Sequence, residues 1–226
     1  MALRVFELLD DEVATGALVQ DGEVVAAGTR LATVNGPARS ILAAERLALN
    51  LLGQLSGVAT ATRALVDRVE GTGARIIDTR KTVPLLRALQ KQAVVAGGGA
   101  NHRMGLYDQV LIKDNHVEAV GSAAEAVRRA KASVAPEVKV EVEIESLEVL
   151  EDVIEAGADI VMLDNMAPES MRRAVEQAAG RVVLEASGGV TLETVRAVAE
   201  SGVDVISVGW ITHSAPSLDV ALDFEG

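Results

Sequence analysis

Six short apolar runs alternate with helical stretches along residues 74–208, and this alternation constrains the fold more than any other feature of the sequence. The runs are rich in Val and Ile, as buried strands of parallel sheets are. They are Ala74–Ile77, Val110–Ile112, Val138–Ile144, Ile160–Leu163, Val182–Leu184 and Val205–Val208. The helical stretches between them are Leu85–Val95, Ser122–Ala132, Leu147–Ala156, Pro168–Ala179 and Leu192–Glu200. Strands and helices in this order predict a parallel sheet covered by helices.

The length available for this sheet bears on whether it closes. Eight strand–helix units need about 250 residues, whereas the repeats begin only after a long helical stretch from Ala38 to about Val69. An incomplete barrel or a doubly wound sheet therefore fits better. Gly53 and Gly57 lie inside the long helical stretch. Because each weakens a helix by about 1 kcal/mol, they predict a break or a close helix contact.

The two ends of the chain have a different pattern. Met1–Val13 has the spacing of a short amphipathic helix, and Val13–Asn35 alternates like a hairpin that is broken at Asp21-Gly22. This opening is too short to bury a core alone and is typical of the end of a larger domain. Near the other end of the chain, Leu218–Leu222 predicts a closing strand.

Composition excludes several classes of protein. Cysteine is absent, so neither disulfides nor thiol catalysis is available. No apolar run approaches the roughly 20 residues that span a bilayer, and the N-terminus lacks the pattern of a signal peptide, so we expect a cytoplasmic protein with no membrane partner. A formal charge of −12 and 2% aromatic residues argue against nucleic-acid binding.

One basic segment, residues 78–116, stands out in this acidic chain. Its three anions are outnumbered by six cations: Arg80, Lys81, Arg87, Lys91, Arg103 and Lys113. Two of the three histidines, His102 and His116, lie there as well. A cleft lined by positive charge concentrates anions, so the segment predicts a pocket for a small anion. The alternative is a solvated face of scattered Lys and Arg.

Polar groups follow each strand, at the sheet edge where parallel α/β folds bind ligands. Lys113, Glu143, Asp164 and Glu185 directly continue apolar runs. Burying part of such a charge costs several kcal/mol unless the charge is paired. We therefore expect either chemistry or mutual pairing at these positions. One possible chemistry is a Schiff-base aldolase that uses Lys113.

Glycine-bearing loops follow two consecutive late strands. Ser187-Gly188-Gly189 precedes a helix, and Gly209 ends the next strand, which together predict a phosphate site. Gly97–Gly99 could be a second cradle or only a helix C-cap and loop. Arg80 and Arg103 could each grip a carboxylate or phosphate. Glu143 and Asp164 would suit sugar hydroxyls, or Mg²⁺ that a polyphosphate carries; no His or Cys cage for a metal is present.

At these residues the sequence resembles the quinolinate phosphoribosyltransferase family, also called nicotinate-nucleotide pyrophosphorylase (carboxylating). The most specific pieces are Asp78-Thr79-Arg80-Lys81-Thr82 and Lys113-Asp114-Asn115-His116. The resemblance extends from about Leu3 to the end of the chain. Its other pieces are Ala44-Glu45-Arg46, Asn50-Leu51, Leu55–Thr60, Asn101-His102-Arg103, Leu111-Ile112, Glu141-Val142-Glu143, Leu163-Asp164-Asn165, Ser187-Gly188-Gly189, Gly209 and Thr212-His213-Ser214.

The resemblance implies an α/β fold, with an open parallel barrel beside a small α/β sandwich domain. We expect the sandwich to comprise residues 1–47 and 215–226, and the catalytic barrel residues 48–214. The family transfers a phosphoribosyl group from phosphoribosyl pyrophosphate, with Mg²⁺, to quinolinate. Decarboxylation then gives nicotinate mononucleotide, CO₂ and pyrophosphate for NAD biosynthesis. The family also implies a homodimer with shared active sites.

The resemblance also implies roles for single residues. Arg80, His102 and Arg103 would hold the two carboxylates of quinolinate, and Lys81 and Lys113 would face a carboxylate or pyrophosphate. The implied catalytic residues are Lys81, Lys113, Glu143 and Asp164. The implied substrate-binding residues are Arg46, Thr79, Arg80, Lys81, His102, Arg103, Lys113, Glu143, Asp164, Ser187, Gly188, Gly189 and Gly209.

The remaining roles concern the sugar, the phosphate and the partner. Glu143 and Asp164 would bind the ribose and stabilise positive charge at C1′, because fixed charges aimed at developing charge favour the transition state. Ser187, Gly188, Gly189 and Gly209 would hold phosphate. Arg46 would reach into the partner subunit's site.

Three features depart from the family pattern. The family carries a longer segment ahead of Leu3, so we expect part of the N-terminal domain to be lacking. Gln92 and Val95 stand where Tyr and Arg are common, which removes one cation. Trp210 stands where a small residue is usual and would either narrow the phosphate site or anchor the core. The alternatives are a relative linked to molybdenum transport, a related pyridine-type transferase with another substrate, or a truncated chain that only binds phosphates.

Overall fold

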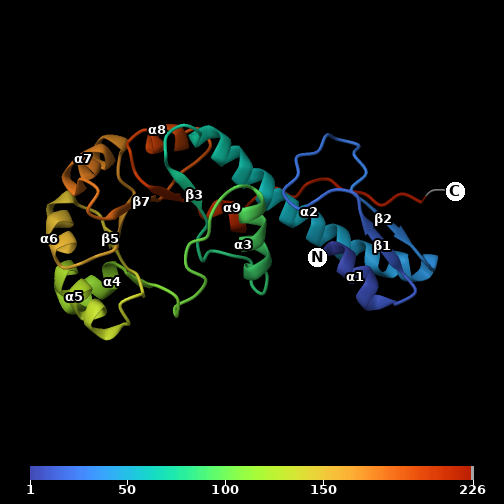
Figure 1. Ribbon diagram of the computed structural model, residues 1–226, viewed down its shortest axis with the longest axis horizontal. Helices are drawn as coiled ribbons and strands as arrows, with labels where there is room; N and C mark the ends of the chain where they lie inside the picture. Colours follow the sequence, from blue (N-terminus) through green and yellow to red (C-terminus); the bar gives the residue numbers. More distant parts are fainter. Residues whose placement is uncertain (225–226) are drawn as a thin grey trace.

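The structure is a computed structural model that describes residues 1–224, and its smaller part lies beside the first half of the long helix α2 (Figure 1). This part contains α1 (Ala2–Leu9), β1 (Ala14–Ala17) and β2 (Ala32–Asn35), and the two strands pair antiparallel. The hairpin prediction is confirmed, but the strands are short because residues 18–31 form a loop with turns at Gly22 and Gly28.

A small hydrophobic core holds this part together. Its buried members come from α1, from the residue just before β1 and from the first turns of α2. They are Phe6, Val13, Ile41, Ala44 and Ala48. Leu222 packs against this core, so the end of the chain returns to the part where the chain began. The predicted domain boundaries at residues 47/48 and 214/215 stay predictions.

The long helix α2 (Ala38–Val69) runs unbroken past both of its glycines. A Cβ on Gly57 would lie 2.0 Å from the carbonyl oxygen of Pro216, and one on Gly53 would lie 2.8 Å from that of Leu218. The backbone N–H of Leu218 also donates to the Gly53 carbonyl at 3.0 Å. The glycines therefore mark a close contact, as one of the two alternatives predicted, but with an extended segment rather than a helix. The closing strand predicted over Leu218–Leu222 is wrong, because this stretch lies along α2 and pairs with no strand.

The larger part is built on six parallel strands, in the order β3-β8-β7-β6-β5-β4. They are β3 (Arg75–Ile77), β4 (Val110–Ile112), β5 (Val140–Ile144), β6 (Ile160–Asp164), β7 (Val183–Ser187) and β8 (Val205–Ser207). A doubly wound sheet would reverse its strand order midway. Here the order follows the chain from β4 to β8 and then returns to β3, which gives a barrel left open between β3 and β4.

Helices cover the outside of this barrel (Figure 1). They are α3 (Arg87–Ala96), α4 (Asp114–Val120), α5 (Ala123–Ser133), the 3₁₀ turn η1 (Leu147–Val149), α6 (Leu150–Glu155), α7 (Pro168–Ala178), α8 (Val195–Ala199) and α9 (Trp210–His213). The open barrel predicted from the sequence is confirmed. The short helices α4 and α9 were not predicted.

Strand alternation decides which side chains enter the barrel. On β5, Val140, Val142 and Ile144 belong to the main hydrophobic core, so Glu141 and Glu143 lie on the opposite, interior face. The apolar rows between strands and helices thus supply the stability, while interior positions are free to carry polar groups.

Segment 97–104 fills the open side of the barrel next to β3. The N–H of Ala100 donates to the Ile76 carbonyl at 2.9 Å, and the N–H of Asp78 donates back to the Ala100 carbonyl at 3.2 Å. A Cβ on Gly97 would lie 2.3 Å from the Ala59 carbonyl of α2. Gly97–Gly99 therefore ends α3 and permits close packing, which supports the C-cap alternative over a phosphate cradle. Across residues 1–224, no helix is long and apolar enough to cross a membrane.

Candidate active site

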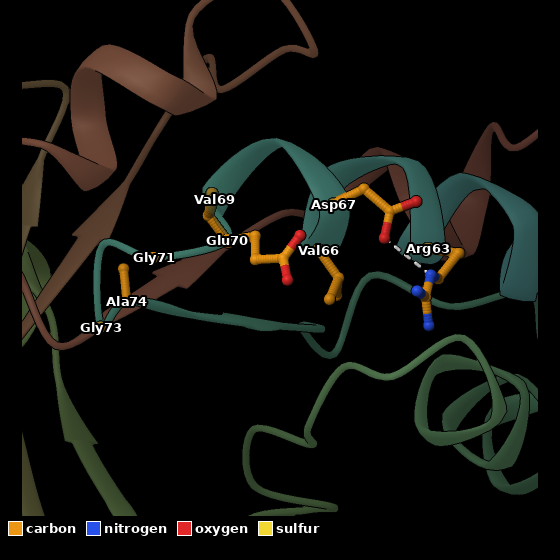
Figure 2. A pocket seen from close by; sticks show the side chains of 8 residues that line it. All are labelled: Arg63, Val66, Asp67, Val69, Glu70, Gly71, Gly73 and Ala74. Atoms are coloured by element: carbon orange, nitrogen blue, oxygen red, sulfur yellow. Dashed lines mark ion pairs between the residues drawn. The ribbon is translucent and has the colours of Figure 1, made fainter.

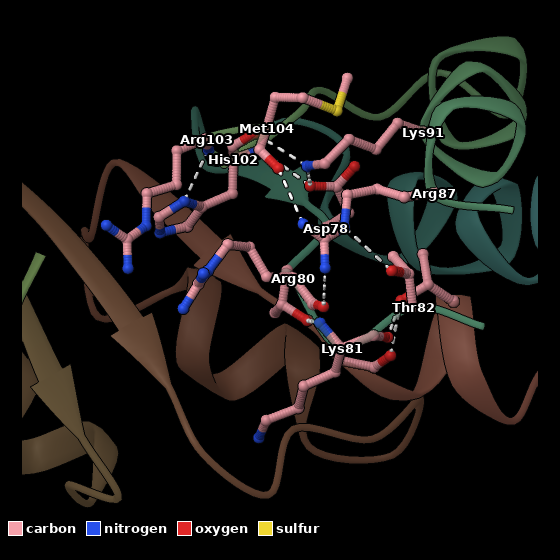
Figure 3. Close-up of polar contacts among 12 residues, drawn as sticks. Asp78, Arg80, Lys81, Thr82, Arg87, Lys91, His102, Arg103 and Met104 are labelled. Carbon is pink, nitrogen blue, oxygen red and sulfur yellow. Dashed lines mark hydrogen bonds and ion pairs between the residues drawn. The ribbon is translucent and has the colours of Figure 1, made fainter. Parts of the chain in front are cut away.

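A buried ion pair between Asp78 and Lys91 organises the start of the site (Figure 3). Asp78 follows β3 and is fully buried, and Lys91 of α3 is 1% exposed. The Lys91 Nζ donates to Asp78 and, at 2.8 Å, to the His102 carbonyl, while the His102 N–H donates to Asp78 at 2.9 Å. Burial raises the pKa of Asp78, and the hydrogen bond from Lys91 opposes that rise. The pair therefore ties the segment after β3 to the segment that fills the barrel gap.

Arg87 of α3 joins the same two segments. Its guanidinium donates to the Thr82 hydroxyl at 3.0 Å, to the Met104 carbonyl at 3.1 Å and to the Arg80 carbonyl at 3.1 Å. Lys91 and Arg87 thus have structural contacts, although both contribute to the basic segment seen in the sequence. The cations left to face a ligand are Arg80, Lys81, Arg103 and Lys113.

Arg80 and Arg103 direct their guanidinium groups to the same side of the site (Figure 3). Arg103 is 7% exposed, and its Nη1 donates to the Gln109 carbonyl at 3.0 Å. Its Nε is buried and has no partner within the described chain. Burial, followed by the charge of Arg80, lowers the pKa of Arg103. Two neighbouring guanidinium groups repel each other, and a bound dianion would relieve that repulsion.

His102 turns away from the solvent rather than toward it. Its side chain is 6% exposed, and its Nε2 lies 3.2 Å from Glu141 Oε2 and 3.7 Å from Glu185 Oε2. Gln109 Nε2 donates to the same Glu141 oxygen at 2.6 Å. Neither Glu141 nor Gln109 was predicted as a site residue. Two-residue alternation with Glu143 could have revealed Glu141, and Glu185 was recognised as an anomalous charge.

Lys113 and Glu143 form an ion pair across the ends of β4 and β5. Lys113 Nζ lies 2.6 Å from Glu143 Oε2, and the two side chains are 46% and 10% exposed. The His116 ring accepts the Lys113 N–H at 2.9 Å, so the Lys-Asp-Asn-His motif caps α4. An ammonium engaged with a carboxylate does not suit a Schiff-base nucleophile. Mutual pairing therefore explains these two strand-end charges in the ligand-free chain.

The glycine-bearing ends of β7 and β8 behave as close-approach positions. Gly188 has a φ of +95°, and a Cβ there would lie 2.2 Å from Asn165 Oδ1. Beside it, Asp164 and Ser187 are paired residues of β6 and β7. Gly188 is therefore packed closely against Asn165, whereas Gly189, with a φ of +61°, has open space beside it that a ligand could reach.

Gly209 marks a second close-approach position on the same rim. A Cβ on it would meet Lys81 Cδ at 3.2 Å, and His213 Nε2 and Thr79 Oγ1 at 3.5 Å each. The Thr212 hydroxyl donates to the Lys81 carbonyl at 2.7 Å, which holds this arrangement together. The structure thus brings Thr79, Lys81 and Gly209 to one place, as the sequence predicted.

Trp210 anchors the loop beside this rim. Its Nε1 donates to the Val190 carbonyl at 3.0 Å, and its ring packs against the main core. This arrangement supports the core-anchor alternative for Trp210.

Gln92 and Val95, the other two positions that depart from the family pattern, are exposed on α3.

Arg46 stands apart from the other predicted site residues. It lies on α2 with a side chain that is 75% exposed, and its ion pair is a loose one of 3.7 Å with Glu45. Its predicted reach into a partner subunit stays a prediction.

Hollows also occur away from these residues. One of about 260 Å³ lies between the end of α2 and the turn at Gly71 and Gly73 (Figure 2). Its wall carries the exposed Arg63–Asp67 ion pair, at 2.7 Å, and none of the predicted site residues. We therefore place the candidate site at the barrel rim.

Comparison with known proteins identifies the family of the chain. Residues 1–56 match the family described as "Quinolinate phosphoribosyl transferase, N-terminal domain", and residues 58–223 match the C-terminal domain of the same family. A Bacillus subtilis protein named probable nicotinate-nucleotide pyrophosphorylase (carboxylating) is 46% identical over 218 residues, which cover 96% of this chain and 75% of that protein. A Mycobacterium leprae protein named nicotinate-nucleotide pyrophosphorylase (carboxylating) is 50% identical over 208 residues, covering 91% and 73%.

Solved structures give the same result. The crystal structure of NadC from Streptococcus pyogenes has a TM-score of 0.92 and 42% identity, covering 96% of this chain and 77% of that one. The nicotinate-nucleotide pyrophosphorylase from Francisella tularensis has a TM-score of 0.93 and 44% identity, covering 96% and 78%. The open α/β barrel and these similarities define the class of the protein as a phosphoribosyltransferase-type enzyme. The chain belongs to the quinolinate phosphoribosyltransferase family.

Proposed function

We propose that this chain transfers a phosphoribosyl group from phosphoribosyl pyrophosphate to quinolinate and decarboxylates the adduct to nicotinate mononucleotide. One observation carries the proposal: the Arg80 and Arg103 guanidinium groups lie side by side, with Arg103 Nε buried and unpartnered within the described chain. That arrangement suits a ligand with two neighbouring carboxylates. The names of the relatives point to the same reaction.

The rest of the rim would receive phosphoribosyl pyrophosphate. The open space beside Gly189, which follows Ser187 and Gly188, suits the 5′-phosphate, because glycines let N–H groups approach an anion. Glu143 and Asp164, at the ends of β5 and β6, would bind the ribose hydroxyls. Mg²⁺ would arrive on the pyrophosphate, whose oxygens are the ligands that it prefers.

The chemistry then needs two steps. The ring nitrogen of quinolinate forms a bond to C1′ while the bond from C1′ to pyrophosphate breaks, and its electron pair leaves with pyrophosphate. Glu143 and Asp164 would stabilise the positive charge on the sugar at that moment. The nitrogen is now cationic, so the adjacent carboxylate can leave as CO₂. The electron pair stays on the ring carbon and takes up a proton.

Lys113 would be released from Glu143 as substrate binds. In the ligand-free chain its ammonium is paired with that carboxylate at 2.6 Å. Pyrophosphate or a substrate carboxylate would compete for the ammonium and leave Glu143 free for the ribose. We include Lys81 in the same role, since it lies beside Gly209 and is exposed.

The test is formation of nicotinate mononucleotide from quinolinate, phosphoribosyl pyrophosphate and Mg²⁺, with nicotinic acid as a parallel substrate. We expect product from quinolinate only. Arg80→Ala should raise KM for quinolinate by about 10- to 100-fold, because charge-assisted hydrogen bonds contribute about 1.5–3 kcal/mol. Arg172→Ala, an exposed change on α7, is the matched control. A folded protein that makes no product, or an Arg80→Ala variant with unchanged KM, would contradict the proposal.

The proposal extends to a cytoplasmic homodimer with shared sites. Arg46 is exposed and free to reach a second copy. If it does, Arg46→Ala and Glu143→Gln chains should each be inactive alone and regain part of the activity when mixed. Failure of mixing to restore activity, in chains shown to exchange subunits, would remove the shared site.

A further inference from the structure

Three groups inside the barrel, His102, Glu141 and Glu185, form a cluster whose ligand-type atoms all lie within 4.8 Å of one another. Glu141 is fully buried and Glu185 is 1% exposed. In the described chain, one oxygen of each carboxyl, Oε1, is buried without a partner. The cluster lies beneath Arg103, whose Nε is unpartnered as well.

Two ionised carboxylates this close repel strongly, so one of them keeps a proton. The groups that face Glu185 are Glu141, His102 and the Ser207 hydroxyl. Burial, and then the charge of Glu141, raises the pKa of Glu185 to about 8. Burial opposes the charged form of His102, but the hydrogen bond to Glu141 and the carboxylate charges outweigh it and raise the pKa of the ring. Glu185 therefore keeps its proton at neutral pH, whereas the Arg103 N–H that His102 Nδ1 accepts favours a ring with a single proton on Nε2.

The hydrogen bonds of His102 argue against a metal ion in this cluster. The Arg103 N–H donates to His102 Nδ1 at 2.7 Å, so Nδ1 is an acceptor and the ring proton is on Nε2. Nε2 is the atom that faces the two carboxylates. A histidine ligates a metal through an unprotonated nitrogen, so this tautomer presents a hydrogen-bond donor to Glu141 instead.

Glu141 is connected to Arg103 by two routes. Through His102, it orients the ring that accepts the Arg103 backbone N–H. Through Gln109, whose side chain donates to Glu141 at 2.6 Å, it fixes the residue whose carbonyl accepts from Arg103 Nη1 at 3.0 Å. One carboxylate therefore orients both the backbone and the guanidinium of Arg103.

We propose that Glu185 is a positioning residue, which as a neutral acid lets Glu141 alone carry the negative charge that orients Arg103 at the anion pocket. This inference rests on the proposed function of the same site. If Glu185 loses its proton, a second negative charge appears beneath Arg103. The other charged groups near Arg103 are Arg80 and Asp108, and neither would cancel that charge change. Binding of a substrate with two carboxylates would weaken.

The kinetic test compares wild-type protein with Glu185→Gln, which mimics the neutral acid. Between about pH 7 and about pH 9.5 we expect the wild-type KM for quinolinate to rise about tenfold, while kcat changes less. The cause is the one negative charge that Glu185 gains near Arg103. In Glu185→Gln the KM should stay level, with near wild-type values at neutral pH. Glu148→Gln, exposed on η1, is the matched control and should follow the wild type. The same alkaline rise in Glu185→Gln would overturn the proposal.

A spectroscopic test needs no catalysis. The infrared difference spectrum of ligand-free protein between about pH 6 and about pH 10 should show one protonated carboxyl band that disappears near pH 8. The band should be absent in Glu185→Gln and should move to lower pH in Glu141→Gln, because the neighbouring charge is gone. A wild-type protein without the band, or one that binds Zn²⁺ through these groups, would refute the inference. A protein that shows the band but makes no nicotinate mononucleotide would refute the proposed function instead.

Discussion

Replacing Lys91 with Met should destabilise the fold far more than removing an exposed cation. Lys91 is 1% exposed and its partner Asp78 is fully buried. Without the ammonium, Asp78 still accepts a hydrogen bond from the N–H of His102. In its favoured orientation the Asn101 side-chain nitrogen also donates to Asp78 Oδ2, at 2.6 Å. Neither supplies a positive charge, and breaking a buried pair in this way costs about 3–5 kcal/mol. In a chain of this size that corresponds to a fall in Tm of roughly 6–20 °C.

The penalty should also depend on pH. Burial already raises the pKa of Asp78, and Lys91 opposes that rise. In Lys91→Met the pKa of the Asp78 carboxyl would rise further, so this carboxyl would keep its proton to a higher pH. The free energy of unfolding of the variant should therefore be highest in acid and should fall as pH rises through the pKa of Asp78 in the folded state. The loss in free energy of unfolding relative to wild type should therefore be small near pH 4 and should reach its whole value near pH 7.

Urea unfolding followed by circular dichroism measures both effects. Arg63→Ala is the matched control, because Arg63 pairs with Asp67 at 2.7 Å with both side chains 55% exposed, and such pairs contribute about 0–1 kcal/mol. The double variant Asp78→Asn with Lys91→Met should recover part of the loss. If Lys91→Met costs no more than Arg63→Ala at pH 7, the buried pair does not organise this region as argued.

Three further predictions concern single positions. Gly57→Ala should cost about 1–3 kcal/mol in urea unfolding, because its Cβ would lie 2.0 Å from the Pro216 carbonyl; an unchanged midpoint would contradict the contact. Gly188→Ala should raise KM for phosphoribosyl pyrophosphate several-fold, because its φ is +95° and Asn165 lies 2.2 Å from the new Cβ; an unchanged KM would argue against a phosphate loop. Burial raises the pKa of Glu185 to about 8, so Tm should fall from about pH 5 to about pH 8 and fall less in Glu185→Gln; equal slopes would oppose a neutral acid.

The strands and the long helix could be predicted because one physical signal dominates each. The run at Val110–Ile112 is a short apolar stretch bounded by polar residues, and its predicted bounds match β4. The helix predicted from Ala38 to about Val69 matches α2, although two glycines weaken it, because the C-terminal segment packs against both. Strand number and length left either an incomplete barrel or a doubly wound sheet, and the family resemblance selected the open barrel.

Other features depend on contacts that one sequence does not reveal. Leu218–Leu222 alternates as a strand does, yet its backbone pairs with a helix glycine. Lys91 looks like an ordinary helix cation until the fold places it against Asp78. Glu141 lies in the middle of an apolar run, and only the barrel shows that His102 and Gln109 converge on it. Side chains distant in sequence make these sites, so local patterns did not predict them.

The most direct test of the central claim is release of labelled CO₂ from quinolinate that carries the label in the carboxylate beside the ring nitrogen. We predict release only when phosphoribosyl pyrophosphate and Mg²⁺ are both present, in equal amount with nicotinate mononucleotide. This result would show that the folded chain couples phosphoribosyl transfer to decarboxylation of quinolinate. No release from the folded protein, or release without phosphoribosyl pyrophosphate, would contradict the account.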